Sequence, residues 1–238
     1  MPSLDRPSDL LARASLFAGQ PIPVLEGIGA AMRQALFPAG RLIFGRGDPG
    51  DALYLVLSGR VRLSILTPEG RELSFAHAIT GDIFGEIAVL DGSPRSADAT
   101  AIDDVSALCL AGPQFNALIN QHTSLARAVI RFLCWRLREV SDHLEDIALL
   151  PLEARIARFL LNRAAASPGA AGNAAGARRI TLGISQSELA LLIGASRQKV
   201  NAALMLLEQS GAIKRKGMDY DYDRSLLQQI AQRGENSG

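Results

Sequence analysis

The most informative segment of this chain is residues 81–97, Gly-Asp-Ile-Phe-Gly-Glu-Ile-Ala-Val-Leu-Asp-Gly-Ser-Pro-Arg-Ser-Ala. Its glycines permit tight backbone turns, and amide groups exposed in such turns can meet an anion. Glu86 is a single acid among apolar neighbours, and Arg95 is a single base in a turn of small residues. A carboxylate and a guanidinium suit a ligand that offers hydroxyl groups and one phosphate. The same two residues could equally form a structural ion pair, and their chemistry alone leaves both interpretations open.

Around this stretch, residues 21–122 have the pattern of a β domain. Glycines and prolines recur there and separate short apolar segments with the alternation or the short buried run of strands. The clearest segments are 53–57, 61–65, 73–75 and 105–110. Many short strands at even spacing indicate a sandwich or a barrel. The preceding residues, 1–20, predict only a short helix or a frayed N-terminal arm.

The pattern changes to a helical one after residue 113. One apolar row has spacings that alternate between four and three, which is a heptad seam: Ala126, Ile130, Leu133, Leu137, Val140, Leu144 and Ile147. Such a seam calls for a partner helix. A second apolar row on an adjacent face can pack on the β domain: Leu125, Val129 and Phe132. We therefore expect residues 123–150 to form a long dimerisation helix, with an ordinary buried helix as the alternative.

The remaining residues, 151–238, begin at a proline that breaks the long helix. Ser185 and Glu188 have the spacing of a capping box, so a short helix is expected after Ser185. A glycine ends that helix, and Ser196 caps a second one. Two short helices joined by a glycine-containing turn form a helix-turn-helix unit, and residues 212–217 resemble a β wing after it.

This C-terminal region carries a local excess of positive charge. Residues 178–217 contain seven basic and two acidic side chains, while the whole chain has 25 basic and 24 acidic residues. A concentrated basic surface displaces counterions from DNA phosphates. Arginine pairs with guanine and glutamine or asparagine with adenine in the major groove. We predict that the DNA-binding residues are Ser185, Gln186, Ser196, Arg197, Gln198, Lys199, Asn201 and Lys214.

Two motifs carry a resemblance to a known family. Phe-Gly-Glu-Ile-Ala at 84–88 and Pro-Arg-Ser-Ala at 94–97 resemble the phosphate-binding cassette of cyclic-nucleotide-binding β-rolls. The helix that begins with Ser196-Arg197 resembles that of the bacterial CRP/FNR transcription regulators. The likeness runs from about residue 37 to residue 216, in the family's order. It implies an α+β fold with an N-terminal antiparallel, jelly-roll-like β-roll, a long central dimerisation helix and a C-terminal winged helix-turn-helix.

The resemblance also implies a function. The chain would be a homodimer that binds cyclic AMP or cyclic GMP and then a two-fold DNA operator. Glu86 would accept a hydrogen bond from the ribose 2′-hydroxyl, Arg95 would hold the cyclic phosphate, and Ser96 would add a hydroxyl. The pocket would be lined by the backbone around Gly85, Ile87, Ala88 and Ala97.

The sequence departs from the family pattern at two places. Where the family has a Thr-Ser pair that contacts the base, this chain has Val140-Ser141, so the choice between adenine and guanine stays open. The best-known activators have arginine–glutamate and a second arginine four positions on. Here the same positions hold Arg197-Gln198 and Ala202, so their operator does not transfer unchanged.

Composition excludes several other classes of protein. Apolar runs fall far short of a membrane span, and the N-terminus lacks a secretory pattern. Cys109 and Cys134 make no spaced pair, and we expect both to be core thiols of a cytoplasmic protein. We expect no metal and no enzymatic activity. The expected partners are double-stranded DNA, a second copy and RNA polymerase, with no membrane. The alternative is a regulator on the same scaffold that is constitutive or senses another small ligand.

Overall fold

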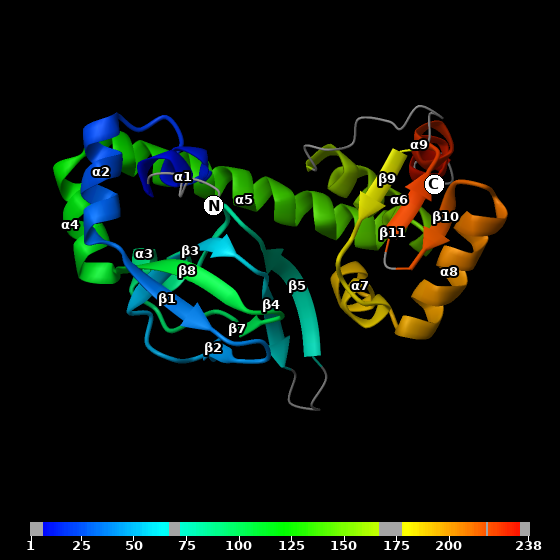
Figure 1. The fold of residues 1–238 in the computed structure, drawn as a ribbon, viewed down its shortest axis with the longest axis horizontal. Coiled ribbons are helices and arrows are strands. Elements are labelled where there is room, and N and C mark those ends of the chain that lie inside the picture. The colour runs from blue at the N-terminus through cyan, green and yellow to red at the C-terminus, as the bar shows by residue number, and fades with distance from the viewer. Residues whose placement is uncertain (1–6, 67–71, 167–177, 218, 234–238) are drawn as a thin grey trace, which may run out of the picture. The chain divides into compact units, whose positions relative to one another are not determined.

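The computed structural model describes residues 7–66, 72–166, 178–217 and 219–233 (Figure 1). The chain divides into two compact units, one up to Arg138 and one from Glu139 onward, and the boundary falls inside one long helix. Each unit has a hydrophobic core of its own. In these described ranges no helix has the length and apolar character needed to cross a membrane.

The strands of the first unit form two antiparallel four-stranded sheets. The first has the order β1-β8-β3-β6 and contains β1 (Arg33–Phe37), β8 (Val105–Ala111), β3 (Ala52–Ser58) and β6 (Ile83–Phe84). The second has the order β2-β7-β4-β5 and contains β2 (Leu42–Phe44), β7 (Asp98–Ala101), β4 (Val61–Leu66) and β5 (Glu72–Ala78). All four predicted strand segments lie in these strands, and the prediction of an N-terminal antiparallel β-roll is confirmed.

Helices complete the first unit. They are α1 (Pro7–Arg13), α2 (Ile22–Ala31), α3 (Glu86–Asp91), α4 (Gly112–Gln121) and the first part of α5 (Thr123–Leu149). Leu11, Leu16 and Phe17 are fully buried in the core that also contains Phe115. Residues 7–20 therefore contain the short helix that the sequence allowed and are packed into the domain, while residues 1–6 lie outside the described ranges. The large apolar residues of 7–20 form only two short pairs, Leu10-Leu11 and Leu16-Phe17, so only the tertiary contacts reveal their burial.

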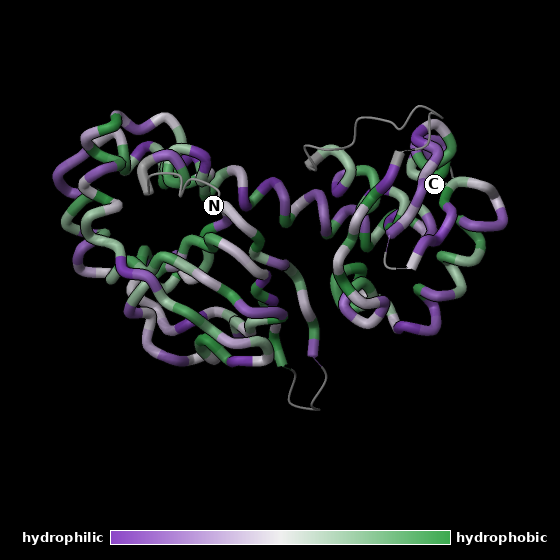
Figure 2. The backbone as a smooth tube through the Cα atoms, viewed as in Figure 1, coloured by the Kyte–Doolittle hydropathy of each residue, from purple (hydrophilic) through white to green (hydrophobic). Residues whose placement is uncertain are grey.

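The helix α5 has two apolar rows with different environments. The row Leu125, Val129 and Phe132 is buried in the core of the first unit, as predicted. The large residues of the heptad seam are 39% to 67% exposed in the single chain. Figure 2 shows hydrophobic and hydrophilic residues alternating along this helix. Cys134 is also exposed and Cys109 is half-buried, so the expectation of core thiols is wrong for Cys134.

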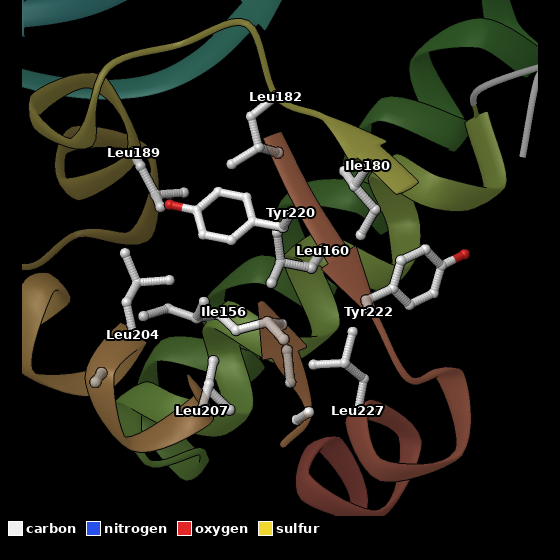
Figure 3. Packing of buried hydrophobic residues seen from close by; sticks show 14 of the residues in the cluster. Ile156, Leu160, Ile180, Leu182, Leu189, Leu204, Leu207, Tyr220, Tyr222 and Leu227 are labelled. Carbon is white, nitrogen blue, oxygen red and sulfur yellow. The ribbon is translucent and has the colours of Figure 1, made fainter. Parts of the chain in front are cut away.

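The second unit is a winged helix-turn-helix, which confirms the prediction for the C-terminal region. After the break at Pro151 it contains α6 (Leu152–Ala166), β9 (Arg178–Thr181), α7 (Gln186–Ile193), α8 (Arg197–Gln209), β10 (Ile213–Lys216), β11 (Asp219–Tyr222) and α9 (Arg224–Arg233). The strand β11 lies between β10 and β9 in one antiparallel sheet. Its tyrosines, Tyr220 and Tyr222, pack among Leu160, Leu204 and other apolar residues in the core (Figure 3).

Candidate nucleotide site and DNA interface

The cassette of residues 81–97 folds around one left-handed glycine. Gly85 has φ +78° and immediately precedes α3, so Glu86 becomes the first residue of that helix. A Cβ atom at residue 85 would lie 2.8 Å from Nη1 of Arg95. A side chain there would be strained by the positive φ and would push on the guanidinium, so this position requires glycine. The turn thereby brings the two charged residues of the motif to the same region.

The guanidinium of Arg95 is buried and held on several sides. The residue is 3% exposed, and its Nη1 donates to the Gly85 carbonyl oxygen at 2.7 Å. Its Nη2 pairs with Oδ1 of Asp51 at 3.0 Å, and its Cζ lies 4.1 Å from the centre of the Phe44 ring. Its Nε is buried and has no hydrogen-bond partner among the described residues. A buried donor without a partner costs free energy, so an anion that accepted from this edge would be favoured.

Glu86 is the second buried charge of the cassette and is 5% exposed. Burial raises the pKa of its carboxyl group, while its own backbone N–H, Arg136 and Arg95 act in the opposite direction. Arg136 is supplied by α5, and its Nη2 donates to the Ile83 carbonyl oxygen at 3.3 Å. Burial disfavours the ionised form of Glu86, and the two arginines stabilise that form.

The ion pair of this turn differs from the one that the sequence suggested. Arg95 forms its salt bridge with Asp51, whose side chain is 81% exposed, rather than with Glu86. The pair joins a buried cation to a carboxylate at the surface, and such exposed carboxylates retain most of their water. Asp51 precedes β3 and lies 44 residues away in sequence, so no local pattern identified it.

Aromatic rings lie next to Arg95. Tyr54 stacks on Phe84 with ring centres 5.0 Å apart, and Phe44 stacks on both with centres 6.0 to 6.1 Å away. Sequence reasoning missed Phe44 and Tyr54 as neighbours of the site. The only available signal was the position of Tyr54 within an alternating strand, which is more often a mark of core packing.

The other predicted pocket residues occupy different environments. Ala88 and Ala97 are buried, whereas Ile87 and Ser96 are exposed. Ala88 packs so closely on Gly50 that a Cβ atom at residue 50 would lie 2.2 Å from that of Ala88. Val140 and Ser141 lie farther along α5, in the second unit, and are exposed. Their proposed contact with a base stays a prediction.

The two helices of the helix-turn-helix begin where the sequence predicted. The Ser185 hydroxyl accepts from the Glu188 backbone N–H at 3.1 Å, and the Ser196 hydroxyl accepts from the Lys199 backbone N–H at 3.3 Å. Gly194 ends α7 with φ +70°. Such caps satisfy backbone donors that the first turn of a helix leaves unpaired. The predicted turn between the helices is confirmed.

The exposed face of α8 carries the predicted DNA-contacting residues. Arg197, Gln198, Lys199 and Asn201 are exposed, while the opposite face of the helix is buried in the core. Gln186 of α7 donates from Nε2 to Oδ1 of Asn201 at 3.2 Å, so the two amides link the two helices. Their individual contacts with DNA stay predictions.

The wing is less positive than the sequence count suggested. Asp221 of β11 pairs with Arg179 at 2.8 Å and with Lys216 at 3.5 Å. The hydrogen bond from Arg179 is the main reason why the pKa of Asp221 is lowered. The count of basic residues over 178–217 ended before β11, and strand pairing then placed an acid between two of them. Lys214 is exposed on β10 and keeps its place in the predicted interface.

In the described part of the molecule, no three His, Cys, Asp or Glu side chains gather as a metal site would require.

Comparison with known proteins agrees with this architecture. Residues 35–122 match the model of the cyclic nucleotide-binding domain, and residues 154–230 match the model of the Crp-like helix-turn-helix domain. The fold and these two matches define a DNA-binding transcription regulator with a cyclic-nucleotide-binding domain. The chain belongs to the CRP/FNR family of transcription regulators.

Individual relatives cover most of the chain. The "CRP-like cAMP-activated global transcriptional regulator" of Mycobacterium tuberculosis is 32% identical over 209 residues, which are 88% of this chain and 92% of that protein. The "Cyclic AMP receptor protein" of Thermus thermophilus is 34% identical over 200 residues, 84% of this chain and 88% of that one. The structure of FixK2 from Bradyrhizobium japonicum has a TM-score of 0.74 at 23% identity, covering 84% of this chain and 96% of that one.

Proposed function

We propose that this protein is a transcription regulator whose DNA binding responds to a cyclic nucleotide. The observation that carries the proposal is the buried guanidinium of Arg95, which has a donor without a partner among the described residues. A cyclic phosphate would accept from that edge in a geometry that suits a guanidinium. The buried carboxylate of Glu86 would accept from the ribose 2′-hydroxyl. Ser96 and the backbone around Gly85, Ile87, Ala88 and Ala97 would complete the pocket.

Cyclic AMP is the first effector to test. Two of the relatives carry cyclic AMP in their names, which supports the same nucleotide here. Val140 and Ser141 are proposed as the base contacts. Cyclic GMP is the matched competitor, because it shares the ribose and the cyclic phosphate and differs only in the base.

The active form is proposed to be a homodimer in the cytoplasm, acting on RNA polymerase from a palindromic operator. The exposed heptad seam of α5 supports this, because a second copy would cover those apolar residues. Each dimer would place two recognition helices about 34 Å apart, one turn of DNA. The nucleotide would act by binding one arrangement of the helices more tightly than the other. Leu137→Asp should convert the dimer to monomers in sedimentation, and a persistent dimer would contradict the seam.

The direct test of the proposal is calorimetric titration of nucleotide-stripped protein with cyclic AMP and, separately, cyclic GMP. The same samples should then be titrated with duplex DNA, with and without nucleotide. Binding of one nucleotide together with tighter DNA binding supports the proposal. DNA binding that ignores both nucleotides would instead favour a constitutive regulator or one with another small ligand.

A further inference from the structure

The outward face of α8 bears one stripe of side chains with mixed chemistry. Its members follow one another at spacings of four, three and four residues, which keeps them on one side of the helix: Gln198, Ala202, Met205 and Gln209. All four are exposed, and the opposite side of α8 is buried. The middle of the stripe is apolar, and Met205 is 51% exposed.

The surroundings of this stripe indicate what would cover it. Arg197 and Lys199 flank its N-terminal end and are exposed. An exposed apolar stripe with cations at its N-terminal end is complementary, at that end, to an anionic surface that also offers apolar groups. The major groove of DNA has this character, because thymine presents a C5-methyl group there between the phosphate-bearing strands. The charge of the region disfavours a basic or purely apolar protein partner.

The side chains of the stripe differ in the base pairs that they suit. The glutamine amide can donate from its NH₂ to adenine N7 and accept at its oxygen from adenine N6, which is a bidentate contact. Ala202 and Met205 cannot form hydrogen bonds to guanine or cytosine, but each can contact a thymine methyl group. Asn201, beside the stripe, already accepts from Gln186 through Oδ1, which leaves it fewer ways to read a base.

We propose that Gln198, Ala202 and Met205 make this regulator select adjacent A·T pairs in each operator half-site. Gln198 contacts an adenine, and Ala202 and Met205 pack on thymine methyl groups. The inference rests on the proposed function, because it requires that α8 enters the major groove. It adds to that function the base composition of the DNA that is recognised.

The first experiment is selection of bound duplexes from a random library by the full-length protein, with and without cyclic AMP. The selected half-sites should contain adjacent A·T pairs. Each thymine of the best site is then replaced by deoxyuridine, which removes only the C5-methyl group. At the contacted positions we expect about fourfold weaker binding per methyl group, from the value of one buried CH₂.

Variants connect the base preference to individual side chains. Met205→Ala should remove the deoxyuridine penalty at one position, whereas the control Met205→Leu, which keeps apolar methyl groups, should retain most of it. Gln198→Glu should shift the preference at another position from adenine to cytosine by about tenfold, because a carboxylate accepts from cytosine N4.

The outcomes separate this inference from the proposed function. Selected sites with G·C pairs at the contacted positions, or deoxyuridine substitutions without effect, would overturn the inference while sequence-specific DNA binding remained. Failure to select any sequence would instead contradict the proposed function. A switch at the Gln198 position without any methyl effect would refute the roles of Ala202 and Met205.

Discussion

The two units of this protein place their functional charges in opposite environments. In the first unit, Glu86 and Arg95 are 5% and 3% exposed and are held by neighbouring groups of the chain. In the second unit, Arg197, Lys199 and Lys214 are exposed to water. Buried charges require partners, because water no longer solvates them, whereas exposed charges retain their hydration and counterions. The first arrangement is suited to one small ligand and the second to a long polyanion.

This contrast predicts different consequences for the loss of one arginine. Arg95→Ala should weaken cyclic nucleotide binding by at least about 100-fold, since it removes charge-assisted hydrogen bonds of about 1.5–3 kcal/mol each. Calorimetric titration measures the change. Arg41→Ala, which removes an exposed arginine of the same unit, is the matched control and should bind normally. Unchanged nucleotide affinity in the Arg95 variant would show that the phosphate binds elsewhere.

A cavity in the core of the second unit should lower the stability of that unit without affecting nucleotide binding by the first. Leu160 is fully buried, so Leu160→Ala should lower the free energy of unfolding of the second unit by about 3 kcal/mol. DNA binding should decrease, while nucleotide binding by the first unit persists. Thermal unfolding followed by the two binding assays tests this, with the exposed Leu206→Ala as the stability control. Equal loss of nucleotide binding would mean that the two units do not fold separately.

The buried carboxylate should make the first unit sensitive to pH. Because burial raises the pKa of Glu86, folding favours its protonated form. This contribution to stability is present below the unfolded pKa of about 4.3 and is lost as the pH rises through the folded value. Glu86→Gln stays neutral and should therefore have a higher Tm than the wild type at pH 7 and a similar Tm at pH 4.

The same substitution should have the opposite effect on ligand binding. An amide accepts a weaker hydrogen bond than a carboxylate, so nucleotide affinity should fall about tenfold. A variant that gains Tm at pH 7 and keeps full affinity would show that Glu86 does not contact the nucleotide.

Salt should distinguish the exposed charges from the buried ones. Each phosphate contact releases condensed counterions, so Lys199→Ala should reduce the slope of log affinity against log salt by about 1 for DNA. Nucleotide affinity should vary much less over the same salt range, since buried pairs are screened weakly. Fluorescence anisotropy and calorimetry at several salt concentrations give the two slopes. Equal slopes for both ligands would contradict the contrast between the units.

The smallest expected effect concerns Asp51. Its exposed carboxylate accepts a hydrogen bond from Nη2 of Arg95, a donor that a phosphate could also use. Because the carboxylate of this pair is exposed and screened by water, we expect the pair to contribute about 0–1 kcal/mol, so Asp51→Asn should tighten nucleotide binding by up to about fivefold. Weaker binding would instead identify Asp51 as a residue that positions the guanidinium.

Local signals in the sequence were sufficient for most of the C-terminal unit. Ser185 and Ser196 were predicted as helix caps, and both hydroxyls accept the expected backbone N–H. Capping depends on residues within one turn of each other, so the pattern is complete in the sequence. The helical spacing of Leu125, Val129 and Phe132 likewise predicted that this row of α5 is buried.

Contacts between distant segments were decided only by the tertiary structure. Asp51 reaches Arg95 across 44 residues, and Asp221 neutralises Arg179 across 42 because β11 pairs with β9. The burial of Leu16 and Phe17 also depends on helices formed later in the chain. The sequence alone determined the order of the domains, the caps and the cassette, because these are encoded by neighbouring residues. Folding decided which charges are paired and which remain exposed, because electrostatic and packing interactions depend on distance in space.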